Sequence, residues 1–170
     1  MAIRELVELA ARVTDMERRM ASVIRHGTVA EVDAERQRVR INFGPAHGGN
    51  GEFLSPWIPY AQFSGALRVH TPPTVGQQLT AMSPTGDFQQ AVAVPLTHHA
   101  GNPSPSTEGD ENVITYGNVR MTLADDLVLV DVGGSIFKMT SAGIRLETNG
   151  SSVELNAAGV SVTGTRIDLN

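Results

Sequence analysis

Residues 144–170 of this chain read IRLETNGSSVELNAAGVSVTGTRIDLN, and they decide the fold of its C-terminal part. Aliphatic and polar side chains alternate in four quartets that begin at Ile144, Val153, Val160 and Ile167. Because successive side chains of a strand point to opposite faces, each quartet places two aliphatic groups on one face and two polar groups on the other. Glycine-containing turns separate the quartets. Short strands at steps of nine, seven and seven residues predict a β-solenoid or an interleaved β-helix.

A single ribbon of this kind has no second layer against which to bury its aliphatic face, and it leaves both sheet edges unpaired. We therefore predict that several identical chains wrap around a shared axis with their aliphatic side chains inward. Three copies are expected, because a triangular cross-section closes thin strands without an empty lumen. The predicted trimer core consists of Ile144, Leu146, Val153, Leu155, Val160, Val162, Ile167 and Leu169.

The N-terminal residues 1–23 carry a second pattern that is typical of association. Apolar residues recur at spacings of three and four, as in the a and d positions of a coiled coil. One amphipathic helix lying on a globular core would fit this short stretch equally well, but a second associating segment on the same chain favours a helical bundle. The predicted seam consists of Leu6, Leu9, Val13, Met16, Met20 and Val23.

Composition limits the function classes. The 170 residues include no cysteine, so neither disulfides nor thiolate metal sites are available. No segment approaches the roughly 18 apolar residues of a membrane span. Residues 1–23 lack the apolar centre of a signal peptide, so we expect synthesis in the cytoplasm without one.

The net charge of −5 is unevenly distributed. Residues 101–170 hold nine acidic and four basic side chains, and therefore carry the whole excess. A nucleic-acid-binding protein typically presents a basic patch, so this acidic rod is not expected to bind nucleic acid or anionic lipid.

Residues 24–97 predict a small barrel. Two strands within 24–43 are followed by an edge segment, 54–60, and by a hairpin that joins 78–82 to 88–94. Five short strands in about 70 residues are typical of a Greek-key barrel of the OB type. The Pro- and Ser-rich residues 98–118 predict a linker or collar, and residues 119–170 the β-helical spike.

The order of motifs in the barrel resembles the OB domain of the baseplate assembly protein V family, the central spike of contractile phage tails, and of the related VgrG spikes of type VI secretion. The motifs are Arg38-Val39-Arg40-Ile41, Pro56-Trp57-Ile58-Pro59, Pro72-Pro73-Thr74-Val75-Gly76 and Ser83-Pro84-Thr85-Gly86-Asp87-Phe88. The resemblance implies a homotrimer whose barrels form a base docked on the tail hub or tube, and whose strands intertwine into a needle driven through the host envelope.

One feature of that family is absent. Many members carry a His-x-His near the C-terminus that binds iron at the apex, whereas this chain has no histidine after His99. Asp168 and Asn170 offer oxygen ligands for a hard cation, but surface-facing polar residues are the favoured interpretation. We expect no tip iron and no other cofactor or metal. The needle would end bluntly or receive a separate apex protein, and the exposed last rung favours the apex protein.

Four other features could indicate a binding or catalytic site, and for each the plain structural reading is favoured. His98 and His99 are adjacent, and adjacent residues on a strand face opposite ways, so they do not share a ligand. The glycine-rich loop 44–51 lacks the lysine and the hydroxyl residue of a phosphate-binding loop, and Asp125-Asp126 with Asp131 are acids around a turn, where they are ordinary solubilising residues. Trp57 has no basic groove beside it, so it suits packing better than base stacking.

No catalytic constellation is present in the sequence, so we expect a non-enzymatic protein. The family resemblance implies a structural protein of the virion tail baseplate. Three alternatives remain: a β-solenoid adhesin or receptor-binding module, a nucleic-acid-binding OB protein, and the spike of a type VI secretion-like or tailocin device. The expected fold is mainly β: a short N-terminal α-helix, an OB-type barrel and a trimeric intertwined β-helix.

Overall fold

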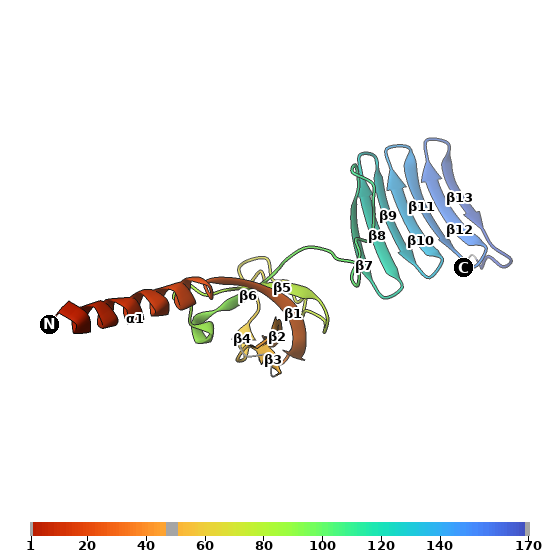
Figure 1. Ribbon diagram of the computed structural model, residues 1–170. Helices are drawn as coiled ribbons and strands as arrows, with labels where there is room; N and C mark the ends of the chain where they lie inside the picture. The colour runs from red at the N-terminus through yellow and green to blue at the C-terminus, as the bar shows by residue number, and fades with distance from the viewer. Residues whose placement is uncertain (1, 47–50, 169–170) are drawn as a thin grey trace. The chain divides into compact units, whose positions relative to one another are not determined.

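The computed structural model describes residues 2–46 and 51–168. The chain divides into two compact units, Met1–Pro103 and Ser104–Asn170. Figure 1 shows a helix and a small, strongly curved sheet in the first unit, and a regular row of strands in the second. The predicted mainly β fold with a short N-terminal helix is confirmed.

Helix α1 spans Ala2–Met20. Its last turn tightens, because the N–H groups of Ser22 and Val23 bond to carbonyl groups only three residues earlier. The chain then enters strand β1 at Ile24, which pairs with Met82. Val23, the last residue of the predicted seam, therefore lies in the turn beyond the helix.

The first unit contains one six-stranded antiparallel sheet in the order β3-β2-β1-β5-β6, with β4 paired to β2. A parallel bridge between Tyr60 and Ala93 joins the end of β4 to β6. The sheet thereby closes on itself, as the predicted OB-type barrel requires. The strands are β1 Ile24–Asp33, β2 Arg38–Pro45, β3 Glu52–Leu54, β4 Ile58–Pro59, β5 Gln78–Met82 and β6 Val92–Pro95.

The barrel buries its own core. Alternate residues of the paired strands point inward, and a set of nine apolar residues is at most 7% exposed. Ser55 fills the one polar position against β2, since its hydroxyl accepts a hydrogen bond from the Ile41 backbone N–H at 2.9 Å. The core consists of Val29, Val39, Ile41, Ile58, Tyr60, Leu79, Ala81, Ala91 and Ala93.

The predicted hairpin partner 88–94 is only partly a strand. Phe88–Gln90 form a short 3-10 helix, η1, and the extended chain resumes at Val92. The Asp87 carboxylate caps η1 by accepting the Gln89 backbone N–H at 2.9 Å. An Asp immediately before the segment stabilises a helical turn there and shortens the strand.

The second unit contains a seven-stranded sheet in which every strand pairs antiparallel with its sequence neighbour, in the order β13 to β7. Figure 1 shows the seven strands side by side. Each connection has two residues, so strands from β8 onward begin every eight residues. The strands are β7 Asn112–Tyr116, β8 Val119–Ala124, β9 Leu127–Val132, β10 Ser135–Thr140, β11 Gly143–Thr148, β12 Ser151–Asn156 and β13 Gly159–Thr163.

Within one chain this sheet is an open meander, not the rungs of the predicted β-helix. The two-residue turns reverse the chain direction, whereas a rung requires the chain to continue around an axis. At the turn between β11 and β12, Asn149 and Gly150 both have positive φ, which is the backbone of a tight hairpin turn. Asn149-Gly150, one of the predicted turns between quartets, therefore forms a hairpin.

Two boundaries also differ from the prediction. The first strand, β7, begins at Asn112, inside the segment 98–118 that was predicted as a linker or collar. The fourth quartet forms no strand through Asp168, because β13 ends at Thr163. Ile167 is thus absent from the sheet, and Leu169 lies outside the described residues.

We expect Ile41→Ala to destabilise the barrel by about 2–5 kcal/mol, because Ile41 is fully buried and its truncation leaves a cavity. Ile24→Ala is the matched control, since the Ile24 side chain is 55% exposed and should cost well under half as much. Denaturant unfolding followed by tryptophan fluorescence of Trp57 measures both. Equal losses in the two variants would contradict the described core.

Candidate functional site

The register of the second sheet collects its aliphatic side chains on one face. Paired residues of neighbouring strands share a face, so each set of aligned residues forms a row across the sheet. One row runs through all seven strands as Ile114, Met121, Val130, Phe137, Leu146, Val153 and Val162. The parallel row on the same face is Asn112, Leu123, Val128, Met139, Ile144, Leu155 and Val160.

We call these two rows the apolar face. Thirteen of their fourteen residues are apolar, and none is buried in the single chain. Leu146, in the middle of the sheet, is 47% exposed, and Val160 near its end is 68% exposed. A face of this size needs a partner in water, because an exposed apolar patch is typical of an interaction surface.

Six members of the predicted trimer core lie on this face: Ile144, Leu146, Val153, Leu155, Val160 and Val162. The residues of the apolar face on β7 to β10 were not included in the predicted trimer core. The sequence contained a pattern that could have identified them, because the residue pairs of the apolar face begin at alternating steps of nine and seven residues from residue 112 to residue 160. Apolar residues occupy both faces of the strand 127–132, so alternation alone does not define its register. The pairing places Val128 and Val130 on the apolar face.

The apolar face is wider at one end of the sheet. A third row on the same side reads Tyr116, Val119 and Val132 across β7 to β9. In β10 to β12 the same row continues with the hydroxyl residues Ser135, Thr148 and Ser151. The side-chain hydroxyl groups of Ser135 and Thr148 form a hydrogen bond of 2.7 Å.

Ile167 covers a small part of the apolar face. It lines a hollow of about 520 Å³ together with Phe137, Leu146, Val153 and Val162. The chain after β13 therefore folds back over its own sheet, which explains how Ile167 can lie with the predicted core although it belongs to no strand.

The opposite face carries the charged side chains of the sheet, together with a few aliphatic residues on β9 and β10, namely Leu127, Leu129 and Ile136. Arg145 bonds to Glu147 at 3.0 Å and to Glu154 at 3.2 Å, and the hydrogen bond that it donates to Glu147 contributes most to the raised pKa of its guanidinium. Beside β8 the segment 104–111 lies against this face, where Arg120 donates to the Pro105 carbonyl at 3.0 Å. The two faces thus differ in chemistry as a buried side and a solvated side do.

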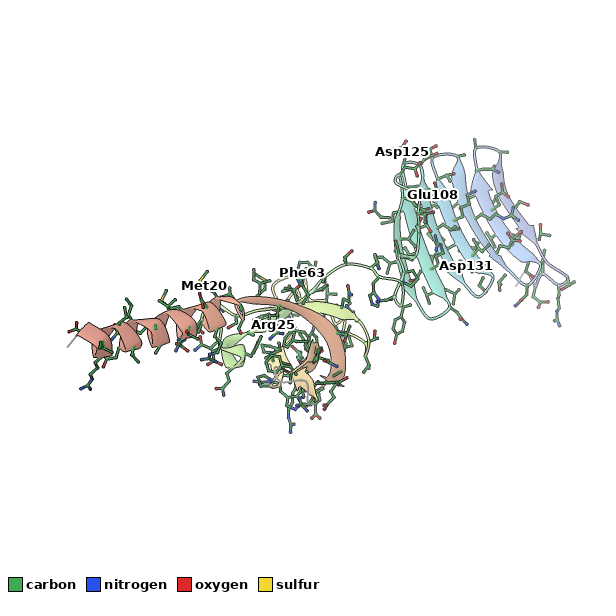
Figure 2. The ribbon with its side chains drawn as sticks, in the orientation of Figure 1. Met20, Arg25, Phe63, Glu108, Asp125 and Asp131 are labelled. Atoms are coloured by element: carbon green, nitrogen blue, oxygen red, sulfur yellow. The ribbon has the colours of Figure 1, made fainter. Side chains whose placement is uncertain are left out.

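Helix α1 presents a second uncovered surface. The seam residues on the helix, Leu6, Leu9, Val13, Met16 and Met20, are between 46% and 70% exposed. Met20 lies at the end of the helix in Figure 2. The described part of the barrel therefore leaves the seam open to another partner.

The histidines are not gathered into a site. The His26 ring bonds to the Thr80 hydroxyl at 2.8 Å, and His99 Nδ1 accepts the Gly101 backbone N–H at 3.2 Å, while the adjacent His98 is exposed. Trp57 is 39% exposed on the barrel. The centre of the glycine-rich loop, residues 47–50 with His47, lies outside the described residues.

The acidic residues near β9 have local structural partners. Figure 2 shows Asp125 and Asp131 toward opposite ends of the strands, so they do not share a site. Asp131 accepts the Gly134 backbone N–H at 2.9 Å, and Asp126 accepts two hydrogen bonds from Ser141. In residues 2–46 and 51–168, no three His, Cys, Asp or Glu side chains gather as metal ligands would.

Comparison with known proteins identifies the barrel. Residues 25–98 match the family described as the type VI secretion system/phage-baseplate injector OB domain. This segment belongs to that family. A spike protein of Escherichia phage P2 is 26% identical over 101 residues, which cover 59% of this chain and 44% of the relative. The resemblance to the baseplate spike family is thereby confirmed.

The matched region spans less than half the length of the phage P2 spike protein. The injector OB domain is the part with family support, and the sheet that follows it carries the apolar face. Across the part of the chain that the structure describes, no helix is both long enough and apolar enough to cross a bilayer.

Acid should weaken the second sheet through Asp126, which ties the β8–β9 turn to Ser141 in the β10–β11 turn. The two hydrogen bonds from Ser141, with its hydroxyl first, hold the pKa of this carboxyl below its ordinary value of 3.8. A lowered pKa stabilises the fold above the ordinary value, and this contribution is lost as pH falls through the folded-state pKa. We therefore expect Asp126→Asn to lower the thermal midpoint at pH 6 and to flatten its fall below pH 4.

Circular dichroism melts between pH 6 and pH 2.5 measure this effect. Asp125→Asn is the control, because Asp125 is the adjacent turn residue and forms none of the hydrogen bonds to Ser141. Identical pH profiles for the two variants would show that the Asp126–Ser141 contact does not contribute.

Proposed function

We propose that this chain is the central spike of a contractile phage tail baseplate. Three copies close their C-terminal sheets around a common axis into a needle, with the apolar faces inward. The OB barrels form a base that docks on the tail hub or tube, and a separate apex protein covers the far end. The needle helps to breach the host envelope and acts without enzymatic chemistry.

The observation that carries this proposal is the uncovered apolar face in a segment directly following an injector OB domain. The barrel buries its core within one chain, whereas the sheet has two rows of aliphatic side chains and no second layer. Copies of the same chain satisfy this need without any further partner, since the same face recurs in each copy.

Two sheets packed face to face would also cover the aliphatic rows, so the number of copies is a separate question. A two-sheet sandwich leaves its lateral sides open to water, whereas three sheets meeting at their strand ends enclose the rows completely. The third row, Tyr116, Val119 and Val132, lies toward these strand ends, which the closed arrangement covers more completely than a sandwich does. These residues support three copies over two.

Such an assembly suits a load along its axis. Seven strands about 4.8 Å apart form a stack roughly 30 Å long. Backbone hydrogen bonds between strands run along the stack, and the enclosed aliphatic core resists lateral collapse because interiors are close-packed. The charged outer faces, with Arg145 and Glu154, keep the rod soluble.

A spike of a type VI secretion-like device is the second candidate. The description of the matched family names both systems, so the OB domain supports either one. Both candidates require the same trimeric needle, and they differ in the particle that carries it. Finding the protein in purified tail particles of a phage, by mass spectrometry, would distinguish the first candidate from the second.

We expect the purified chain to be a trimer of 54.3 kDa, three times the 18.1 kDa of one copy. The double substitution Val160→Asp and Val162→Asp should abolish or severely weaken this trimer. Each carboxylate would be enclosed without a partner, at a cost of about 3–5 kcal/mol per copy. Multi-angle light scattering measures the mass.

Ser161→Asp is the matched control, because Ser161 lies between the two valines in β13 and points to the opposite, solvated face. It should leave the mass at 54.3 kDa. A well-folded wild-type protein of one chain's mass would refute the trimeric needle, and a mass of two chains would refute the three-sided closure. A trimer that survives both valine substitutions would refute the inward orientation of the apolar face.

A further inference from the structure

The charges beside the α1 seam are not all used within the helix. Arg4 pairs with Glu8 at 3.4 Å, and Asp15 pairs with both Arg18 and Arg19 at 2.7 Å. The hydrogen bonds from these two arginines, that of Arg18 first, lower the pKa of the Asp15 carboxyl. The helix thus has its own ionic network along one side.

Arg12 and Glu17 stand apart from that network. Both are exposed, and within the described residues neither forms an ion pair. If Leu6, Val13 and Met20 are the a positions of a heptad, Arg12 is at position g and Glu17 at position e. These two positions flank the apolar seam on its two sides.

We propose that α1 forms a parallel, in-register coiled coil with the same helix of neighbouring copies, and that Arg12 of one copy pairs with Glu17 of the next. In a parallel coiled coil, a g residue contacts the e residue five positions later on the adjacent helix. Arg12 and Glu17 have this spacing and opposite charge. The inference rests on the proposed trimer, because rotation about one axis makes the three helices run in the same direction.

A second copy explains the surface better than an unrelated partner does. The apolar seam and its flanking charges are complementary to themselves, which is the requirement for a symmetric homo-oligomer. Helices in proteins gain most of their stability from packing of an amphipathic face, and this helix of 19 residues leaves its seam exposed. The barrel anchors only its end, where Gly86 lies so close to the Arg19 backbone that a Cβ atom there would overlap it.

Disulfide trapping tests the parallel register, and the chain is suited to it because it contains no native cysteine. Leu6→Cys near the start of the helix should form covalent dimers on mild oxidation, since equivalent a positions of parallel neighbours lie about 6 Å apart at Cα, within disulfide range. Ala11→Cys, at position f on the outer side, should remain monomeric on a non-reducing denaturing gel.

The charge pair is tested in the Leu6→Cys background. Glu17→Arg places two arginines side by side, and the cross-linked fraction at a fixed time should fall about two- to five-fold. Arg12→Glu alone should also lower it, whereas Arg12→Glu with Glu17→Arg should exceed both single variants because the attraction is restored with reversed sign. A double variant no better than the worse single variant would refute the pair.

Disulfide trapping and light scattering together distinguish a failure of the coiled coil from a failure of the trimeric needle. A 54.3 kDa trimer in which Leu6→Cys does not cross-link would refute the coiled coil and leave the needle intact. A monomeric protein would refute both. Equal cross-linking of Leu6→Cys and Ala11→Cys would show unspecific collision and would also refute the proposed register.

Discussion

Apart from the small part beside Ile167, the described residues of one chain leave the aliphatic rows of the C-terminal sheet uncovered, and the behaviour of the sheet depends on how these rows are covered. The hydrophobic effect scales with the apolar area removed from water, so an antiparallel sheet with one such face is stable only when something packs on it. In residues 104–168 the one buried residue is Thr122, which lies on the charged side of the sheet. A single copy of this segment therefore has almost no buried core of its own.

The two units solve the same problem in different ways. The barrel closes its sheet through the Tyr60–Ala93 bridge and buries nine residues inside one chain. The second sheet stays open and flat enough for its seven strands to form continuous rows. A closed barrel suits a base that other proteins contact from outside, and an open sheet suits an element that several copies complete together.

The α1 seam, near the N-terminus, is a second apolar surface that the described residues of one chain leave exposed. Its residues are exposed like those of the apolar face, and its unpaired charges have the spacing of a parallel helix pair. Both surfaces are incomplete in one copy, and the barrel that lies between them in the sequence is complete. The injector OB domain family gives such an assembly a setting in phage tails and related devices.

Much of the fold followed from side-chain periodicity. Alternation placed Leu146 and Val153 on one face, and the motif order around Pro56 and Gly86 identified the barrel family. The hairpin connectivity was missed, although the nine–seven spacing of the apolar pairs contained it. When the chain reverses after each strand of an eight-residue repeat, the residues on one face are spaced alternately by nine and by seven residues. A β-helix in which the chain continues in one direction would keep the same spacing from rung to rung.

The sequence by itself determined which residues must be hidden from water, because alternation and heptad spacing are local properties of the chain. Only the tertiary structure decided how those residues are joined: that Asn149-Gly150 reverses the chain, that Asp87 turns Phe88–Gln90 into a 3-10 helix, and that Ile167 folds back onto its own sheet. Turn direction and register depend on contacts between strands, which a local pattern leaves undefined.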